Sequence, residues 1–217
     1  MMNLFTVFDP CTGLFSLNWL SVFGFFFFFP LSFWFCKGIL VTLFYNFLLG
    51  FFFELKNLTF YLSSILFFMS LFFYILIVNM IGLVPYVYTC SSHLLFSLGL
   101  SLPFWLGLMF FGWLNNSNSM FIHMVPVGTP YILMPFMVII ETVSNLIRPF
   151  SLAVRLSANM IAGHLLMSLL GGSTCSDLIY LLLFFFVFMI IYVFELAVSF
   201  IQSYVFVTLS VLYSSEV

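Results

Sequence analysis

The residues best suited to chemistry lie in one apolar stretch of the chain, residues 141–171. Arg155 stands near the middle of this stretch. A charged side chain at the centre of a membrane helix costs roughly 2.5–3.5 kcal/mol on insertion scales, and such residues face a partner, a water-filled cavity or an ion path. The sequence therefore predicts one of these three surroundings for Arg155.

Polar side chains recur around Arg155 at helical spacing. Because an α-helix turns about 100° per residue, steps of seven residues place Glu141, Arg148 and Arg155 on one stripe. Asn145 and Asn159 follow Glu141 and Arg155 by four residues each. This stripe suits an ion pathway, but it equally suits a buried ion pair with amides that hold two helices together, as polar membrane residues often do. Spacing alone leaves both interpretations open.

A second polar stripe lies in the C-terminal apolar segment. Glu195, Ser199 and Gln202 are spaced i, i+4 and i+7, so they share one helix face. We expect the two stripes to face shared water. His164 lies nine residues after Arg155, about 180° round the helix, and is expected to point away from the arginine. It suits a proton relay, because histidine titrates near neutral pH, but an ordinary packing histidine is the alternative.

The composition is that of a membrane protein and excludes a water-soluble domain. Of the 217 residues, 65% are hydrophobic and only 5% are charged, whereas soluble domains carry roughly a quarter charged residues. The net charge of −2 offers nothing that would attract nucleic acid. The four cysteines are scattered without a CxxC pair or a histidine at metal-ligand spacing, so we expect them to be packing residues and not metal ligands. We expect no cofactor either.

The elements that must position these stripes follow from the lengths of the apolar segments. About 20 apolar residues cross a hydrocarbon core of ~30 Å, which predicts a first span, a transmembrane hairpin and two overlong segments: residues 14–35, 58–83 with 94–114, 131–170, and 178–213. Residues 38–57 have a polar end and are predicted to form an amphipathic helix along the membrane surface. Residues 115–130 are predicted to be a loop.

The segment 131–170 is too long for an upright helix. At 1.5 Å per residue it would reach about 60 Å, twice the hydrocarbon thickness. Either Pro135 and Pro149 break it, or it is strongly tilted; the segment 178–213 is equally long and has no internal proline. Joined by a short turn, the two segments predict a near-horizontal hairpin of tilted helices.

The predicted fold class is therefore all-α, a polytopic membrane protein. It has about five membrane-embedded helices and one surface helix, in a single domain. Its three parts are residues 1–57, 58–114 and 131–213. Lys37 and Lys56 bracket the surface helix and assign it to the inner side of the membrane, which leaves the N-terminus and the loop 86–93 outside. The start of the chain has no signal-peptide or transit-peptide pattern, so a protein of an organelle would be made there.

Four strings carry a resemblance to a known family: NMIGLVPY at 79–86, ET at 141–142, SLAVRLSANMIAGHLL at 151–166 and ELAVSFIQSYVF at 195–206. They resemble subunit a of the F-type ATP synthases, in its mitochondrial form. The match is specific in the C-terminal part of the chain, whereas before residue 79 only the hydropathy pattern agrees. The resemblance implies a stator subunit of the membrane sector, encoded in the organelle and located in the mitochondrial inner membrane. Its implied partners are a c-subunit ring and other membrane and peripheral-stalk subunits.

The resemblance also implies roles for individual residues on a proton path. Arg155 matches the essential arginine that faces the ring, and Asn159 follows it as in the family motif. His164 and Glu195 match the pair that lines the path from the outer side, and Gln202 matches a glutamine near the arginine.

The inner half of this path is less fully matched. Glu141 resembles the acidic group of the matrix-side path, while Arg148 is expected to be structural and paired with Glu141. Asn145 and Ser199 are expected to give structural support. The resemblance thus implies two aqueous half-channels separated by an arginine, in a subunit that couples proton flow to ring rotation without being catalytic by itself.

Three other functions compete with this interpretation. A quinone- or haem-associated respiratory subunit would need histidines at membrane depth on facing helices, and only His164 clearly lies in a predicted span. A secondary transporter would have internal repeats, which the sequence lacks. A purely structural assembly subunit would use the polar stripes only to bind its neighbours.

Overall fold

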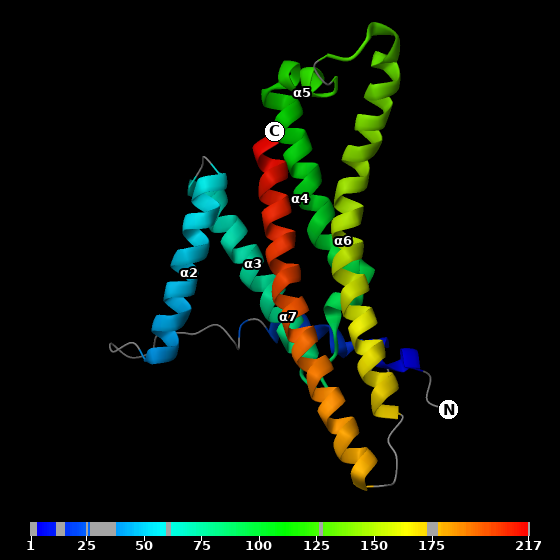
Figure 1. Cartoon of the computed structure of the whole chain (residues 1–217). Helices are drawn as coiled ribbons and strands as arrows, with labels where there is room; N and C mark the ends of the chain where they lie inside the picture. Colours follow the sequence, from blue (N-terminus) through cyan, green and yellow to red (C-terminus); the bar gives the residue numbers. More distant parts are fainter. Residues whose placement is uncertain are drawn as a thin grey trace.

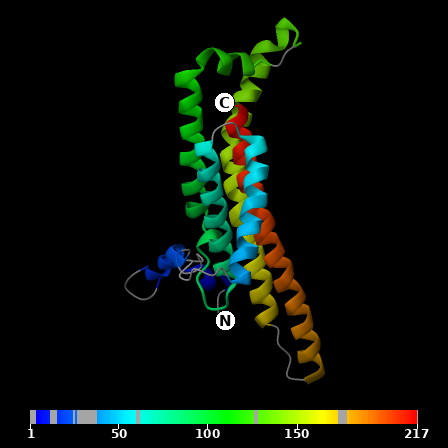
Figure 2. The ribbon, with the colours of Figure 1, turned by 90° about the vertical axis from the view of Figure 1, so that its left-hand side faces the viewer.

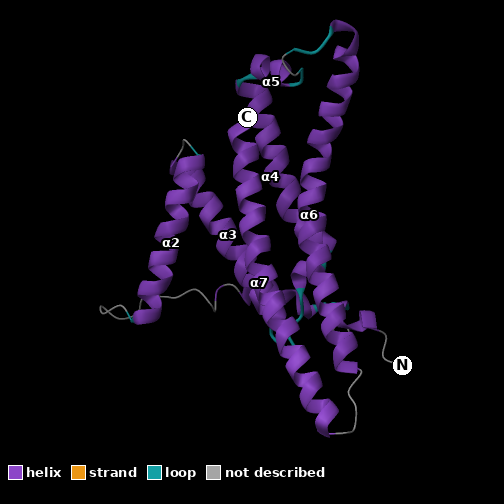
Figure 3. Ribbon diagram, in the orientation of Figure 1, coloured by secondary structure: helices purple, strands orange, loops and turns teal. Residues whose placement is uncertain are grey.

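The computed structural model describes residues 4–11, 16–24, 26, 38–59, 62–125, 128–172 and 178–216. The described part of the chain consists of helices and connecting turns and contains no strand (Figure 3). The all-α prediction is therefore confirmed. Continuous helix is the expected outcome for so apolar a chain, because in lipid each backbone N–H and C=O must find its partner within the segment.

Four of the described helices are long and apolar enough to cross a membrane. They are α3 (Leu62–Leu83), α4 (Leu94–Asn115), α6 (Met134–Gly172) and α7 (Leu178–Glu216). The chain is thus a multi-pass membrane protein. The helices pack in neighbouring pairs, α3 against α7, α7 against α6, and α6 against α4 (Figure 1).

The α6 helix is continuous over 39 residues, so the alternative in which prolines break it is wrong. Pro135 is its second residue, where the missing N–H has no partner to lose. Pro149 lies inside the helix and is buried, and neighbouring helices commonly compensate such a proline in membranes. The α7 helix is also 39 residues long. The overlong hairpin is present, and its tilt to the bilayer stays a prediction.

The apolar core gathers around α3, which is largely enclosed by the other helices. The adjacent helix α2 (Ile39–Leu58) contributes to this core, as do α6 and α7. Its most buried side chains include Leu55, Ile65, Phe68, Ile75, Leu156, Phe206, Val207 and Val211. By contrast, α4, α6 and α7 expose most of their apolar surface, as helices that face lipid or partner subunits do.

The predicted helix over 38–57 is present as α2, which packs against α3 and contacts α7 (Figure 2), while its N-terminal end diverges from the bundle in Figure 1. Phe51 and Leu55 are its buried contacts. Its position along the membrane surface therefore depends on the tilt of the whole bundle and stays a prediction.

The first predicted span, 14–35, includes residues 14–15, 25 and 27–35, which lie outside the described residues. Its described part is a 3-10 helix, η2 (Leu17–Gly24), so the prediction of an α-helix is wrong there. Long-range contacts hold this segment against α3 and the turn that follows α3. Trp19 packs against Tyr88, with ring centroids 6.1 Å apart, and a β-carbon at Gly24 would lie 2.9 Å from the side chain of Ile81.

The predicted loop 115–130 contains a short helix, α5 (Ser117–His123), so the loop prediction is wrong for these residues. The ring of Phe121 packs edge-on against Trp113 at the end of α4, with centroids 4.8 Å apart. This contact folds α5 back onto α4. The turn between α3 and α4 contains another 3-10 helix, η3 (Cys90–Ser92).

Candidate functional site

The two polar stripes meet where α6 and α7 cross. The Asn159 amide Nδ2 donates a hydrogen bond of 2.9 Å to Oε1 of Gln202. Gln202 is buried, so this hydrogen bond satisfies an amide oxygen that would otherwise be costly to bury. The structure therefore brings together two residues that periodicity alone placed on separate helices.

Glu195 lies on the same pair of helices, seven residues before Gln202 on α7. Its side chain is buried and its carboxylate rests on the backbone of Gly163, where an added β-carbon would overlap it. Within the described part of the chain, Oε1 of Glu195 has no hydrogen-bond partner. A glycine at residue 163 is what allows this approach, because any side chain would occupy the space of the carboxylate.

Ser199 has a local role. Its hydroxyl donates to the carbonyl of Leu196 at 2.7 Å and lies 3.3 Å from the sulfur of Met80 on α3. The contact with Met80 joins α7 to α3, whereas the hydrogen bond to Leu196 stays within α7. Structural support by Ser199 stays a prediction.

His164 lines a cavity of about 920 Å³ at the end of the bundle that holds the N-terminal segment. Among the described residues, its walls are formed by the N-terminal segment, the turn after α3 and the facing parts of α6 and α7. Ser168 of α6 and Tyr192 of α7 contribute to these walls. The imidazole Nε2 is buried and has no partner among the described residues. Buried polar atoms of this kind commonly bind ordered water. His164 and Glu195 are thus close in position, since Glu195 touches residue 163, but no hydrogen bond joins them in the described structure.

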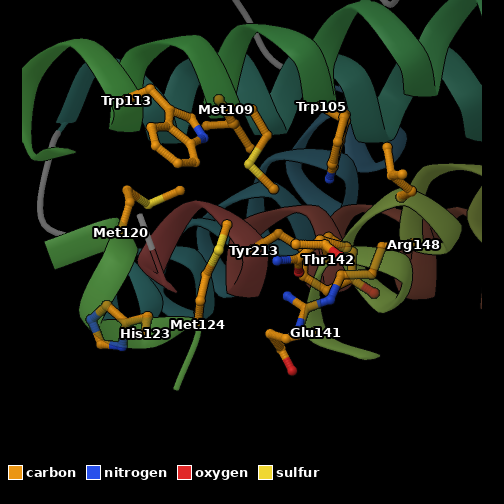
Figure 4. A pocket seen from close by; sticks show the side chains of 13 residues that line it. Trp105, Met109, Trp113, Met120, His123, Met124, Glu141, Thr142, Arg148 and Tyr213 are labelled. Atoms are coloured by element: carbon orange, nitrogen blue, oxygen red, sulfur yellow. Dashed lines mark ion pairs between the residues drawn. The ribbon is translucent and has the colours of Figure 1, made fainter. Parts of the chain in front are cut away.

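Another cavity, of about 540 Å³, lies at the opposite end of α6. Glu141, Asn145 and Arg148 line it from α6, and aromatic and methionine side chains of α4 and α5 form the facing wall (Figure 4). Arg148 Nη2 lies 3.7 Å from Oε1 of Glu141, and its guanidinium stands over the ring of Tyr213 at 5.0 Å from the centroid. Arg148 therefore connects the N-terminal half of α6 with the C-terminal end of α7.

Arg155 stands between the two cavities on α6. It comes seven residues after Arg148 and nine before His164, or about 10 and 14 Å along the helix axis. Its side chain is exposed, while the neighbouring Leu156 is fully buried. Among the described residues, no carboxylate lies within ion-pair distance of Arg155. The guanidinium thus points out of this chain's own packing, and the internal ion pair considered for it from spacing is absent there.

Some residues of this region were not identified by sequence patterns. Asn79 on α3 is completely buried, and neither of its amide atoms has a partner in the described part of the molecule. The sequence did offer a signal that could have identified Asn79, because this residue is an amide inside an apolar span. Phe8, whose ring lies edge-on to His164, gave no such signal because the two are far apart in the sequence.

The chain is similar to known proteins over nearly its whole length. Residues 15–215 match the model of the family described as ATP synthase A chain. The chain is 50% identical to ATP synthase subunit a of Anopheles gambiae and of Drosophila melanogaster, and 47% identical to that of Locusta migratoria. Each of these alignments covers 100% of this chain and 99% of the relative.

Proposed function

The chain belongs to the ATP synthase A chain family, and on that premise we propose that it conducts protons through two half-channels that end on either side of Arg155. Family membership makes it a proton-channel subunit of the membrane sector of ATP synthase. The proposal adds the path and the residues along it. It also adds the location, the mitochondrial inner membrane, and the partners, a ring of c-subunits together with other membrane and peripheral-stalk subunits.

The arrangement of cavities along α6 carries this proposal. His164 lines the cavity at one end, and Glu141, Asn145 and Arg148 line the cavity at the other. Arg155 lies between them with its side chain outward. Two cavities that approach one fixed cation from opposite ends support separate entry and exit routes better than one continuous pore.

Arg155 would act on an ionisable group carried by the rotating partner. A carboxyl group can pass through lipid only when it is neutral, because an ion in hydrocarbon is costly. A guanidinium stays charged at any physiological pH, so it favours the ionised carboxylate directly in front of it. As a fixed positive charge it also repels protons between the two half-channels. Protons must therefore travel with the ring instead of leaking past it.

The other residues take positions along this route. A proton entering from the outer side would pass His164 and Glu195 before it reaches the ring. It would leave past Glu141 on the inner side after nearly one turn. The Asn159 and Gln202 pair would keep the crossing of α6 and α7 rigid beside Arg155. The driving force is about 2.3 kcal/mol per charge for each 100 mV, and no cofactor is needed.

The family assignment argues against the alternative of a haem- or quinone-associated subunit. A transporter or a purely structural subunit is likewise not favoured by any feature of the described structure. The near-horizontal hairpin would give α6 and α7 a long face toward several ring helices. Small residues of α6, Ser151, Ala158 and Ala162 among them, are exposed and would permit close approach.

The test is substitution of Arg155 by alanine in the assembled complex, with Arg148→Ala as the matched control. ATP hydrolysis, ATP-driven proton pumping and ATP synthesis are measured on the same membranes. We expect Arg155→Ala to abolish pumping and synthesis while the complex still assembles, because the barrier between the half-channels is gone. Arg148→Ala should retain most of the coupling. Coupled synthesis by Arg155→Ala at the wild-type rate would refute the proposal.

A further inference from the structure

The N-terminal segment closes one side of the cavity that contains His164. Residues Thr6, Val7, Asp9 and Cys11 line this cavity, and the 3-10 helix η1 (Leu4–Phe8) contacts α6. The ring of Phe8 lies edge-on to the imidazole of His164, with centroids 6.5 Å apart and an interplanar angle of 86°. A segment at the start of the chain thus touches a titratable residue near its far end.

Hydrogen bonds to the backbone carbonyl of Phe8 hold this residue in place. Its carbonyl oxygen lies 3.0 Å from Nε2 of His93 and 3.4 Å from the hydroxyl of Tyr88, and these two side chains also contact each other. A carbonyl can only accept, so Nε2 of His93 carries the hydrogen and Tyr88 donates its O–H to the same oxygen. Burial raises the pKa of Tyr88 to about 12, so this hydroxyl remains a donor at physiological pH.

The anchor is itself supported by packing. The indole of Trp19 lies against both anchoring rings, at 6.1 Å from Tyr88 and 5.3 Å from His93 between centroids. His93 comes directly before α4, and Tyr88 lies in the turn that follows α3. The N-terminal segment is therefore tied to the connection between two membrane helices, and Phe8 is not a loose end.

The imidazole of His164, by contrast, is not held through its Nε2 atom. In the described structure its Nε2 has no hydrogen-bond partner, and edge-to-face aromatic contacts are a common way to fix a ring. Resting on the function proposed above, we propose that Phe8 is a positioning residue for His164: it holds the imidazole toward the cavity, and Tyr88 and His93 hold Phe8.

The test uses the assembled complex in membranes, where ATP-driven proton pumping is measured beside ATP hydrolysis. Phe8→Ala should slow pumping about three- to tenfold, the range that loss of an aromatic pair implies. Phe8→Leu, which keeps most of the bulk, should restore most of the rate. The control is Phe23→Ala, because Phe23 is an exposed phenylalanine of η2; this variant should pump at the wild-type rate.

A double variant separates positioning from general damage. If Phe8 acts through His164, adding Phe8→Ala to His164→Gln should slow pumping no further than His164→Gln alone. Additive losses would overturn the inference, as would an unchanged rate in Phe8→Ala. If His164→Gln itself leaves pumping unchanged, then His164 is not on the proton path, and the function proposed for this residue fails instead.

A milder variant tests the same inference if the complex with Phe8→Ala does not assemble. Tyr88→Phe removes only the hydroxyl, which donates to the Phe8 carbonyl and also contacts His93. If Phe8→Ala does not assemble, Tyr88→Phe decides the matter in the same assays. Slower pumping that vanishes in the His164→Gln background supports the inference, and an unchanged rate overturns it.

Discussion

Glu195 lies directly against Gly163, so closely that a β-carbon at residue 163 would overlap its carboxylate. The contact joins α7 to α6 one residue before His164. It is made by the end of a flexible side chain, so the carboxylate can move aside with little strain on the backbone. The relationship therefore constrains the position of the carboxylate more than it constrains the stability of the fold.

Replacing Gly163 by alanine should separate function from stability. Alanine is favoured over glycine inside a helix by about 1 kcal/mol, which offsets the cost of moving the glutamate. Because small misplacements of a reacting group can cost a hundredfold, we expect proton pumping to fall about tenfold or more while the amount of assembled complex stays the same. The control is Gly107→Ala on α4, where an added β-carbon meets open space. Wild-type pumping by Gly163→Ala would show that the position of Glu195 is unimportant.

The hydrogen bond between Asn159 and Gln202 should behave as a unit. Asn159→Ala leaves the buried Gln202 oxygen without its partner, at a cost of about 1–3 kcal/mol. Replacing both residues by alanine should destabilise the complex less than the sum of the two single changes. Thermal unfolding of the purified complex in detergent gives the coupling, for which about 0.6 kcal/mol is typical between membrane helices. A coupling of zero would mean that the hydrogen bond does not join the helices in the assembled complex.

Glu141 and Arg148 should differ in their effects although they form an ion pair. The pair is partly exposed, with 37% and 28% of the two side chains accessible, so breaking it should cost less than about 1 kcal/mol. We therefore expect Arg148→Ala to reduce ATP synthesis only slightly. Glu141→Gln removes a proton acceptor and should slow synthesis severalfold. Rates of ATP synthesis at matched complex levels distinguish the two, and equal losses would indicate that the ion pair, not proton transfer, is what matters.

Ser199 should be replaceable by alanine. Its hydroxyl donates to a carbonyl within its own helix, and its position is fully buried. Alanine fits the same space and leaves the helical backbone hydrogen bonds intact. Proton pumping should stay within about twofold of the wild-type rate, since no buried donor or acceptor is left stranded. A collapse of pumping would instead make this hydroxyl part of the proton path.

Much of the fold follows from the sequence because membrane helices obey local rules. The lengths of the apolar segments predicted α3, α4, α6 and α7 to within a few residues at most ends. Helical periodicity predicted that Glu141 and Arg148 share a face, and they form an ion pair one heptad apart. In an environment without water, length and periodicity are decided by neighbours along the chain.

Contacts between helices were decided only by the tertiary structure. The approach of Glu195 to Gly163, the hydrogen bond of Asn159 to Gln202, and the contact of Phe8 with His164 depend on how two helices cross and on their register. The contact of α5 with α4 and that of η2 with the turn after α3 likewise join rings from different elements of the chain. Periodicity selects the face of a helix, but the packing of many side chains at once selects which faces meet.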